Sequence, residues 1–255
     1  MEPDAIVREF TVQSEAFNAA PVMRSADTLG RLLDLIPAAP GERWLDAACG
    51  PGLVARGLAP RVGEVCGVDM TPAMVELAHR EAVREGIENA VFQIGDVTRL
   101  EFEPGSFDGA VTRFSLHHIP LPGRVVDELA RVVRPGGAVV LADHVTSDDV
   151  EAATWHQEIE RLRDPSHWAC LTPRGVRRLG ERAGLVLERE QVSPLHLDFE
   201  EWIVRGSGGE RSRALIDQAL DERVPAPEVF RVRAENGERV LELRYSLSLW
   251  RRPRR

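Results

Sequence analysis

The sequence predicts a doubly wound α/β domain, in which a largely parallel sheet is covered by helices on both faces. Five short apolar runs alternate with helix-like segments of about 10–15 residues, the spacing of right-handed β-α-β crossovers. Glycine or proline ends most of these segments. The chain has 255 residues, of which 43% are hydrophobic and 29% charged, and this suits one large globular domain.

The predicted elements follow one another in a regular order. A helix is expected over residues 28–37, where the apolar spacing is helical and Pro37 ends it. The expected strands are residues 43–48, 64–69, 90–96, 107–114 and 138–145, and the helices between them are 53–60, 71–86 and 123–137. Thr71 followed by Pro72 marks a helix start.

The alternation changes after residue 146. Residues 149–171 begin as a helix and continue into an irregular segment that contains tryptophan and histidine. A helix is expected over 172–185, a strand over 186–192 and interrupted helices over 199–222. Residues 238–252 are predicted to form a final strand that pairs antiparallel beside the sixth.

Composition excludes several classes of protein. The formal net charge of −9 argues against a nucleic-acid binder, which would carry a basic face. The three cysteines have no paired spacing, which suits a reducing compartment. There is no apolar run of about 20 residues to span a bilayer, and the acidic N-terminus lacks the order of a signal peptide. We therefore expect a cytoplasmic protein with no membrane partner.

The turn after the first strand predicts a site for a nucleotide-containing cofactor. Residues 50–55, "GPGLVA", match the G-x-G-x-x-A pattern of nicotinamide enzymes, and similar turns hold S-adenosylmethionine. Asp46 lies four residues before the first glycine, where a carboxylate suits a cationic ligand better than a pyrophosphate. Asp69 and Asp96 end the second and third strands and suit ribose hydroxyls and an adenine amino group. These carboxylates favour S-adenosylmethionine.

The segments "WLDAACGPG", "CGVDMTPAMVELAHR", "FQIGDV", "FDGAVTRFSLHHI" and "ELARVVRPGGAVVLAD" together resemble the class I S-adenosylmethionine-dependent methyltransferases over residues 43–145. The chain is most similar to the small-molecule branch around ubiquinone- and menaquinone-biosynthesis-type enzymes. The resemblance implies a Rossmann-like, seven-stranded, mostly parallel sheet that ends in an antiparallel hairpin, with a helical cap inserted after strand five. It implies cofactor contacts from Asp46, Ala47, Gly50, Gly52, Asp69, Met70, Asp96, Val97 and Arg113.

The chain divides on this basis into three parts. Residues 1–42 are an N-terminal lid and helix, residues 43–146 the cofactor-binding half of the sheet, and residues 147–255 the acceptor-binding cap helices and C-terminal strands of the same domain. The stretch 10–23 is interpreted as a lid that contributes Phe17; a flexible arm or a dimer contact is the alternative.

Histidines provide the candidate catalytic groups. His117 and His118 follow the fourth strand, and either could act as a general base, although packing explains them equally well. The candidate acceptor-binding residues, each with a packing role as its alternative, are Phe17, Asp143, His144, Trp155, His167 and Trp168. No metal site is expected, because Asp143 and His144 lack the further carboxylate of metal-dependent catechol-type enzymes.

The predicted function is transfer of a methyl group from S-adenosylmethionine to carbon, nitrogen or oxygen of a small organic acceptor, in quinone-type or specialised metabolism. The predicted partner is that small molecule, and a second copy of the chain is a further candidate. Two alternatives stay open: a protein of this fold that binds the cofactor without methylating, and a nicotinamide-dependent oxidoreductase. The second lacks support, because the chain has no lysine and a single tyrosine for a Tyr-x-x-x-Lys pair.

Overall fold

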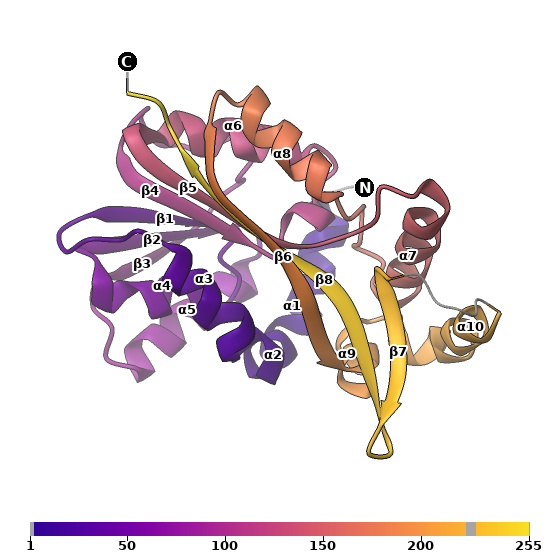
Figure 1. Cartoon of the computed structure of the whole chain (residues 1–255). Helices are drawn as coiled ribbons and strands as arrows, with labels where there is room; N and C mark the ends of the chain where they lie inside the picture. The colour runs from indigo at the N-terminus through magenta and orange to yellow at the C-terminus, as the bar shows by residue number, and fades with distance from the viewer. Residues whose placement is uncertain (1–2, 223–227, 255) are drawn as a thin grey trace.

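Figure 1 shows the computed structural model, which describes residues 3–222 and 228–254. A twisted sheet runs through the molecule in the order β3-β2-β1-β4-β5-β8-β6, and β7 pairs with β8. The strands are β1 (Arg43–Ala47), β2 (Glu64–Asp69), β3 (Ala90–Ile94), β4 (Phe107–Arg113), β5 (Val133–Val145), β6 (Val186–Asp198), β7 (Phe230–Glu235) and β8 (Glu238–Arg251). The first five are mutually parallel, and β8 is antiparallel to both β5 and β6. The predicted doubly wound fold and its antiparallel final strand are confirmed.

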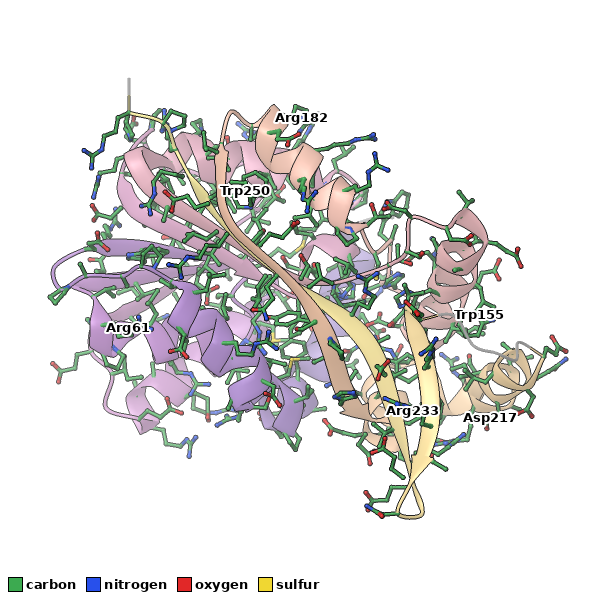
Figure 2. All side chains as sticks on the ribbon, viewed as in Figure 1. Arg61, Trp155, Arg182, Asp217, Arg233 and Trp250 are labelled. Carbon is green, nitrogen blue, oxygen red and sulfur yellow. The ribbon has the colours of Figure 1, made fainter. Side chains whose placement is uncertain are left out.

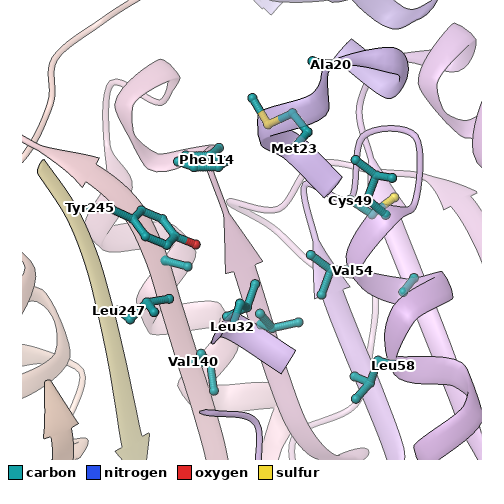
Figure 3. Packing of buried hydrophobic residues seen from close by; sticks show 14 of the residues in the cluster. Ala20, Met23, Leu32, Cys49, Val54, Leu58, Phe114, Val140, Tyr245 and Leu247 are labelled. Atoms are coloured by element: carbon teal, nitrogen blue, oxygen red, sulfur yellow. The ribbon is translucent and has the colours of Figure 1, made fainter. Parts of the chain in front are cut away.

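Helices cover both faces of the sheet (Figure 1). One face carries α3 (Arg31–Leu35), α4 (Leu53–Leu58) and α5 (Pro72–Arg84), and the other carries α6 (Pro122–Val132) and α8 (Pro173–Arg182). Strand side chains alternate between the two resulting cores: Val140 packs into the first and Leu141 into the second. Figure 3 shows part of the first core, where Leu58 of α4 and Val140 of β5 are buried.

The remaining helices lie at the carboxyl ends of the strands and beyond the antiparallel end of the sheet. They are α1 (Pro3–Ala19), α2 (Pro21–Arg24), α7 (Val150–Arg163), α9 (Phe199–Arg205) and α10 (Gly209–Asp221), with single turns at Ala26–Gly30, Ala59–Arg61 and Leu116–His118. Side-chain caps start three of the helices: Asp149 accepts from Ala152 N, Thr172 from Gly175 N and Asp198 from Glu201 N. In the described part of the chain, no helix is long and apolar enough to cross a bilayer.

Two boundaries differ from the sequence prediction by five residues or more. Helix α6 ends at Val132, and residues 133–137 already belong to β5 instead of completing the helix. Val133 pairs with Phe107, and a register shift follows before the regular ladder begins. The predicted strand 186–192 continues to Asp198, because β8 offers a partner along its whole length.

Strand β7 is an element that the sequence analysis missed. It forms a hairpin with β8 through Asn236 and Gly237, which have φ values of 52° and 87°. An Asn-Gly pair with both residues in the left-handed region is the signature of a type I′ hairpin turn. The signal was therefore present in the sequence.

The N-terminal stretch 10–23 is largely helical and covers the second half of α1 and the first three residues of α2. Helix α1 is hydrogen-bonded to the segments that follow α7 and α9: Gln13 Nε2 donates to Asp164 Oδ2 at 3.2 Å, and Glu9 Oε1 accepts from Ser207 N at 2.9 Å. This helix lies across the carboxyl ends of the strands, where Phe10 and Phe17 line cavities. The position suits the predicted lid.

Candidate functional site

A cavity of about 270 Å³ opens where β1, β2, β3 and β4 end. The carboxyl ends of parallel strands meet at one edge of a sheet, so side chains distant in sequence converge there. Seven predicted cofactor residues line this cavity, which we call the first cavity: Asp46, Gly50, Asp69, Met70, Asp96, Val97 and Arg113. The other two, Ala47 and Gly52, are buried and are not part of its lining.

The turn between β1 and α4 requires left-handed backbone. Ala48, Gly50 and Gly52 have φ values of 54°, 51° and 75°, and a non-glycine residue in this region is uncommon. Gly50 N donates to Asp69 Oδ2 at 2.8 Å, which joins the turn to the end of β2. A Cβ on Gly52 would lie 2.7 Å from the Phe92 ring, so this glycine lets the turn pack on the core beneath.

Asp46 presents a buried carboxylate at the start of α4. Its Oδ2 accepts from Ala55 N at 3.0 Å. Burial raises the pKa of Asp46 to about 7, against the lowering effects of the Ala55 hydrogen bond and of Arg113. A cation in the cavity would stabilise the ionised form. The ammonium and sulfonium of S-adenosylmethionine suit this position, whereas a pyrophosphate would be repelled.

Asp69 has both carboxylate oxygens fixed by backbone groups. Oδ1 accepts from Thr71 N at 2.9 Å, and Oδ2 accepts from Gly50 N. Each oxygen has a second lone pair, so the group retains capacity for two ribose hydroxyls. Asp96 holds Thr98 N and Oγ1 through its Oδ1, at 2.8 and 2.7 Å, and its exposed carboxylate lines the cavity. These carboxylates are hydrogen-bond acceptors, and they fit the hydroxyls of a ribose and the amino group of an adenine.

Arg113 connects β4 to the N-terminal helices. Its Nη2 donates to Met23 O at 2.9 Å and to Thr28 Oγ1 at 3.0 Å, and its guanidinium lies 4.8 Å from the centre of the Phe114 ring. Figure 3 shows Phe114 at the end of β4, with Met23 on the neighbouring N-terminal helix. Because its hydrogen bonds serve this connection, Arg113 shapes the wall of the cavity.

A second cavity, of about 50 Å³, adjoins the first. Four residues line both cavities: Phe10, Phe17, Phe114 and His118. The farther wall of the second cavity includes His117, His144, Glu160, Arg163 and Trp202. A ligand there would lie directly beside a cofactor in the first cavity.

The two predicted catalytic histidines differ in placement. His117 lines the second cavity, and its Nδ1 donates to Asp143 Oδ1 at 2.7 Å. Burial lowers the pKa of His117 well below its usual value, so the ring is neutral at physiological pH. His118 lines both cavities, and its Nδ1 donates to Ser166 O at 3.1 Å, which leaves Nε2 as the basic nitrogen.

The predicted acceptor residues separate into two groups. Phe17 and His144 line the second cavity, and Asp143 and His167 are buried beside it in contact with His117. The two tryptophans, Trp155 and Trp168, line neither cavity.

The two tryptophans have different surroundings. Trp155 packs edge-on against Phe230 at 5.8 Å, on the side of α7 toward α10 (Figure 2). Trp168 is 41% exposed.

Glu160 and Phe114, which line the second cavity, were missed by sequence reasoning. Glu160 follows His156 by one helical turn, which was the available signal.

Comparisons with known proteins agree with this geometry. Residues 45–141 match a family described as "Methyltransferase domain". An uncharacterized methyltransferase, YcgJ of Bacillus subtilis (strain 168), is 30% identical over 217 residues, covering 84% of this chain and 86% of that protein. The crystal structure of YcgJ has a TM-score of 0.83 at 28% identity and covers 91% of this chain and 100% of that one.

A demethylmenaquinone methyltransferase from Clavibacter sepedonicus is 32% identical over 149 residues, which is 57% of this chain and 60% of that protein. The glycine turn, the carboxylates at three strand ends and the likeness to YcgJ over most of both chains lead to one conclusion. The chain belongs to the class I S-adenosylmethionine-dependent methyltransferases.

Proposed function

We propose that the enzyme transfers the methyl group of S-adenosylmethionine to a small organic acceptor held in the second cavity. The observation that carries this proposal is the wall shared by the two cavities, formed by Phe10, Phe17, Phe114 and His118. A methyl donor in the first cavity and an acceptor in the second would meet at this wall. The small volume of the second cavity, about 50 Å³, favours a small molecule over a macromolecular acceptor.

The bound cofactor supplies an electrophilic methyl group on a cationic sulfur, which becomes a neutral thioether when the group leaves. The protein then has to align the acceptor and exclude water. Helix α1 covers the shared wall with Phe10 and Phe17. The negative charge of Asp46 beside the cofactor's positive charge, and hydrogen bonds from the ribose hydroxyls to Asp69, would hold the donor in place. His118 is placed to take a proton where the acceptor has one to lose.

The walls of the second cavity indicate the class of acceptor. Phe114, Leu195, Leu197 and Trp202 are apolar, whereas the histidines and Glu160 give one polar side. This lining suits a flat ring with one or two polar substituents. The cavity of about 50 Å³ would have to widen to hold one, because an apolar cavity of about 150 Å³ is what accommodates a benzene ring. The likeness to a demethylmenaquinone methyltransferase supports a quinone-type or specialised-metabolite acceptor.

The test begins with calorimetric titration of the purified chain with S-adenosylmethionine, S-adenosylhomocysteine and NADH. We expect binding of the first two and none of the third. In Asp69→Asn the loss of charged hydrogen bonds should weaken cofactor binding by about 1–3 kcal/mol, and the exposed Asp148→Asn should bind as the unaltered protein does. Binding of NADH alone would contradict the assignment of the first cavity.

The second step is incubation with methyl-labelled cofactor and a panel of quinols, phenols and amines. Transfer of label to a member of the panel is the expected result. Tight cofactor binding without transfer to any small acceptor, together with conversion of an acceptor by another reaction, would show a non-methylating enzyme on this fold.

A further inference from the structure

Five of the seven histidines gather in one buried cluster. His117 and His118 come from the turn after β4, His144 from the end of β5, His156 from α7 and His167 from the loop after it. The ring centroid of His117 lies 4.1 Å from that of His144 and 5.6 Å from that of His167. Imidazoles packed this closely and this deeply are unusual for a core, and the methyl transfer proposed above uses only His118.

Outer hydrogen bonds fix which nitrogen of His117 and His167 carries the lone pair. His117 Nδ1 donates to Asp143 Oδ1 at 2.7 Å, so its Nε2 is the free acceptor. His167 Nε2 donates to Gln157 Oε1 at 2.6 Å, so its Nδ1 is the free acceptor. The Gln157 amide is itself oriented, because Oε1 accepts from Cys170 N and Nε2 donates to Cys170 O, at 2.9 and 3.2 Å.

Several polar atoms of the cluster are buried without a hydrogen-bond partner. They include His144 Nε2, His167 Nδ1 and Glu160 Oε1. His144 Nε2 and Glu160 Oε1 lie 3.7 Å apart, too far for a hydrogen bond. Buried polar groups are normally satisfied, so a convergence of lone pairs needs an explanation. A water molecule can donate only two hydrogen bonds, whereas a cation accepts several lone pairs at once.

We propose that His117, His144 and His167 form a binding site for one divalent first-row transition-metal ion. One ring nitrogen from each of the three lies within 4.8 Å of the other two, close enough for small side-chain movements to bring them to a common ion at bond lengths of about 2.0–2.1 Å. Imidazole ligands suit zinc, iron, cobalt, nickel or copper better than magnesium or calcium. Histidine ligands whose other nitrogen donates to a carboxylate or an amide are typical of such sites.

The position of the site gives the ion a role in binding. His117, His144 and Glu160 line the second cavity, so an ion held by three imidazoles would direct a remaining coordination position into it. An oxygen, nitrogen or sulfur atom of a ligand in that cavity would then bind the ion directly. This inference rests on the histidine cluster and is independent of the methyl transfer.

A competing ligand set exists in the same cluster. His144, His156 and Cys170 also place one ligand atom each within 4.8 Å of the others. His156 and Cys170 are not part of the lining of the second cavity. His156 has its Nδ1 3.2 Å from Thr146 Oγ1 and its Nε2 3.6 Å from Glu160 Oε1. We therefore favour His117, His144 and His167, and the test separates the two sets.

The experiment uses the purified full chain after treatment with EDTA. Cobalt(II) is titrated and followed by its visible d–d absorption, and zinc is measured by mass spectrometry after dialysis. We expect one ion per chain. His117→Ala, His144→Ala and His167→Ala should each lower the affinity by more than about tenfold, and His79→Ala and His196→Ala, which alter the two histidines outside the cluster, should leave it unchanged.

Two further measurements keep the outcome interpretable. Binding of S-adenosylmethionine, whose cavity these three histidines do not line, shows that each variant is folded. Zinc should also raise the midpoint of thermal unfolding of the unaltered protein, because an ion that binds the folded state stabilises it. Absence of stoichiometric metal in the unaltered protein would overturn the proposal. Full metal binding in His117→Ala and His167→Ala, with loss in His156→Ala and Cys170→Ala, would overturn this choice of ligands.

Discussion

Replacing Asp46 with asparagine tests whether this buried carboxylate lowers the stability of the fold at neutral pH while it strengthens cofactor binding. Asp46 is 1% exposed, and burial raises its pKa from an ordinary 3.8 to about 7. Between these values the folded state holds a proton that the unfolded chain has lost. The group therefore stabilises the fold at about pH 5, and this contribution disappears as the pH rises through about 7.

The size of the effect follows from the two pKa values. Between about pH 5 and about pH 8, the contribution of Asp46 to the free energy of unfolding should fall by about 2.5 kcal/mol. Asp46→Asn removes this dependence, and its amide oxygen can still accept from Ala55 N. Other titrating groups are common to both proteins and largely cancel in the comparison. The stability of the variant relative to the unaltered protein should thus rise by about 2.5 kcal/mol over this range.

Urea unfolding without cofactor, measured at intervals between about pH 5 and about pH 8, gives this difference directly. Asp148→Asn is the matched control, and its difference from the unaltered protein should not change with pH. Calorimetry at the upper end of the range should show weaker binding of S-adenosylmethionine to Asp46→Asn, because the carboxylate that faces the cofactor's positive charge is gone. A pH-independent difference, or one that falls as the pH rises, would refute the claim that burial raises this pKa.

Two further predictions concern the scaffold around the site. Gly109→Ala would place a Cβ 2.4 Å from the Trp44 ring, and this overpacking should destabilise the fold by about 1–3 kcal/mol. The control is Gly30→Ala, where the Cβ has ordinary space and the backbone is helical; it should be neutral or stabilising in thermal unfolding. Thr172→Ala removes the N-cap of α8 and should lower the free energy of unfolding in urea by about 1 kcal/mol. The exposed, mid-helix change Thr154→Ala should have little effect, and equal effects of the two threonine changes would argue against the cap.

The cofactor half of the molecule could be predicted because its signals are local. Asp46, Asp69 and Asp96 lie at or just beyond the end of a strand that its own apolar run defines. Parallel strands present those ends at one edge of the sheet. The glycine turn is equally local, since left-handed backbone at Gly50 and Gly52 is required wherever the strand reverses into α4. No long-range packing had to be known for this part of the site.

The sequence alone determined the five parallel strands, the glycine turn and the three carboxylates, because periodicity and turn chemistry act within a few residues. Tertiary packing decided the rest. Trp155 packs against Phe230, which half-buries it. His117, His144 and His167 lie together only because the sheet places β4 beside β5 and the segment after α7 folds back over the ends of these strands. Those histidines are 27 and 23 residues apart in sequence, with no metal-ligand spacing to indicate that their nitrogens converge.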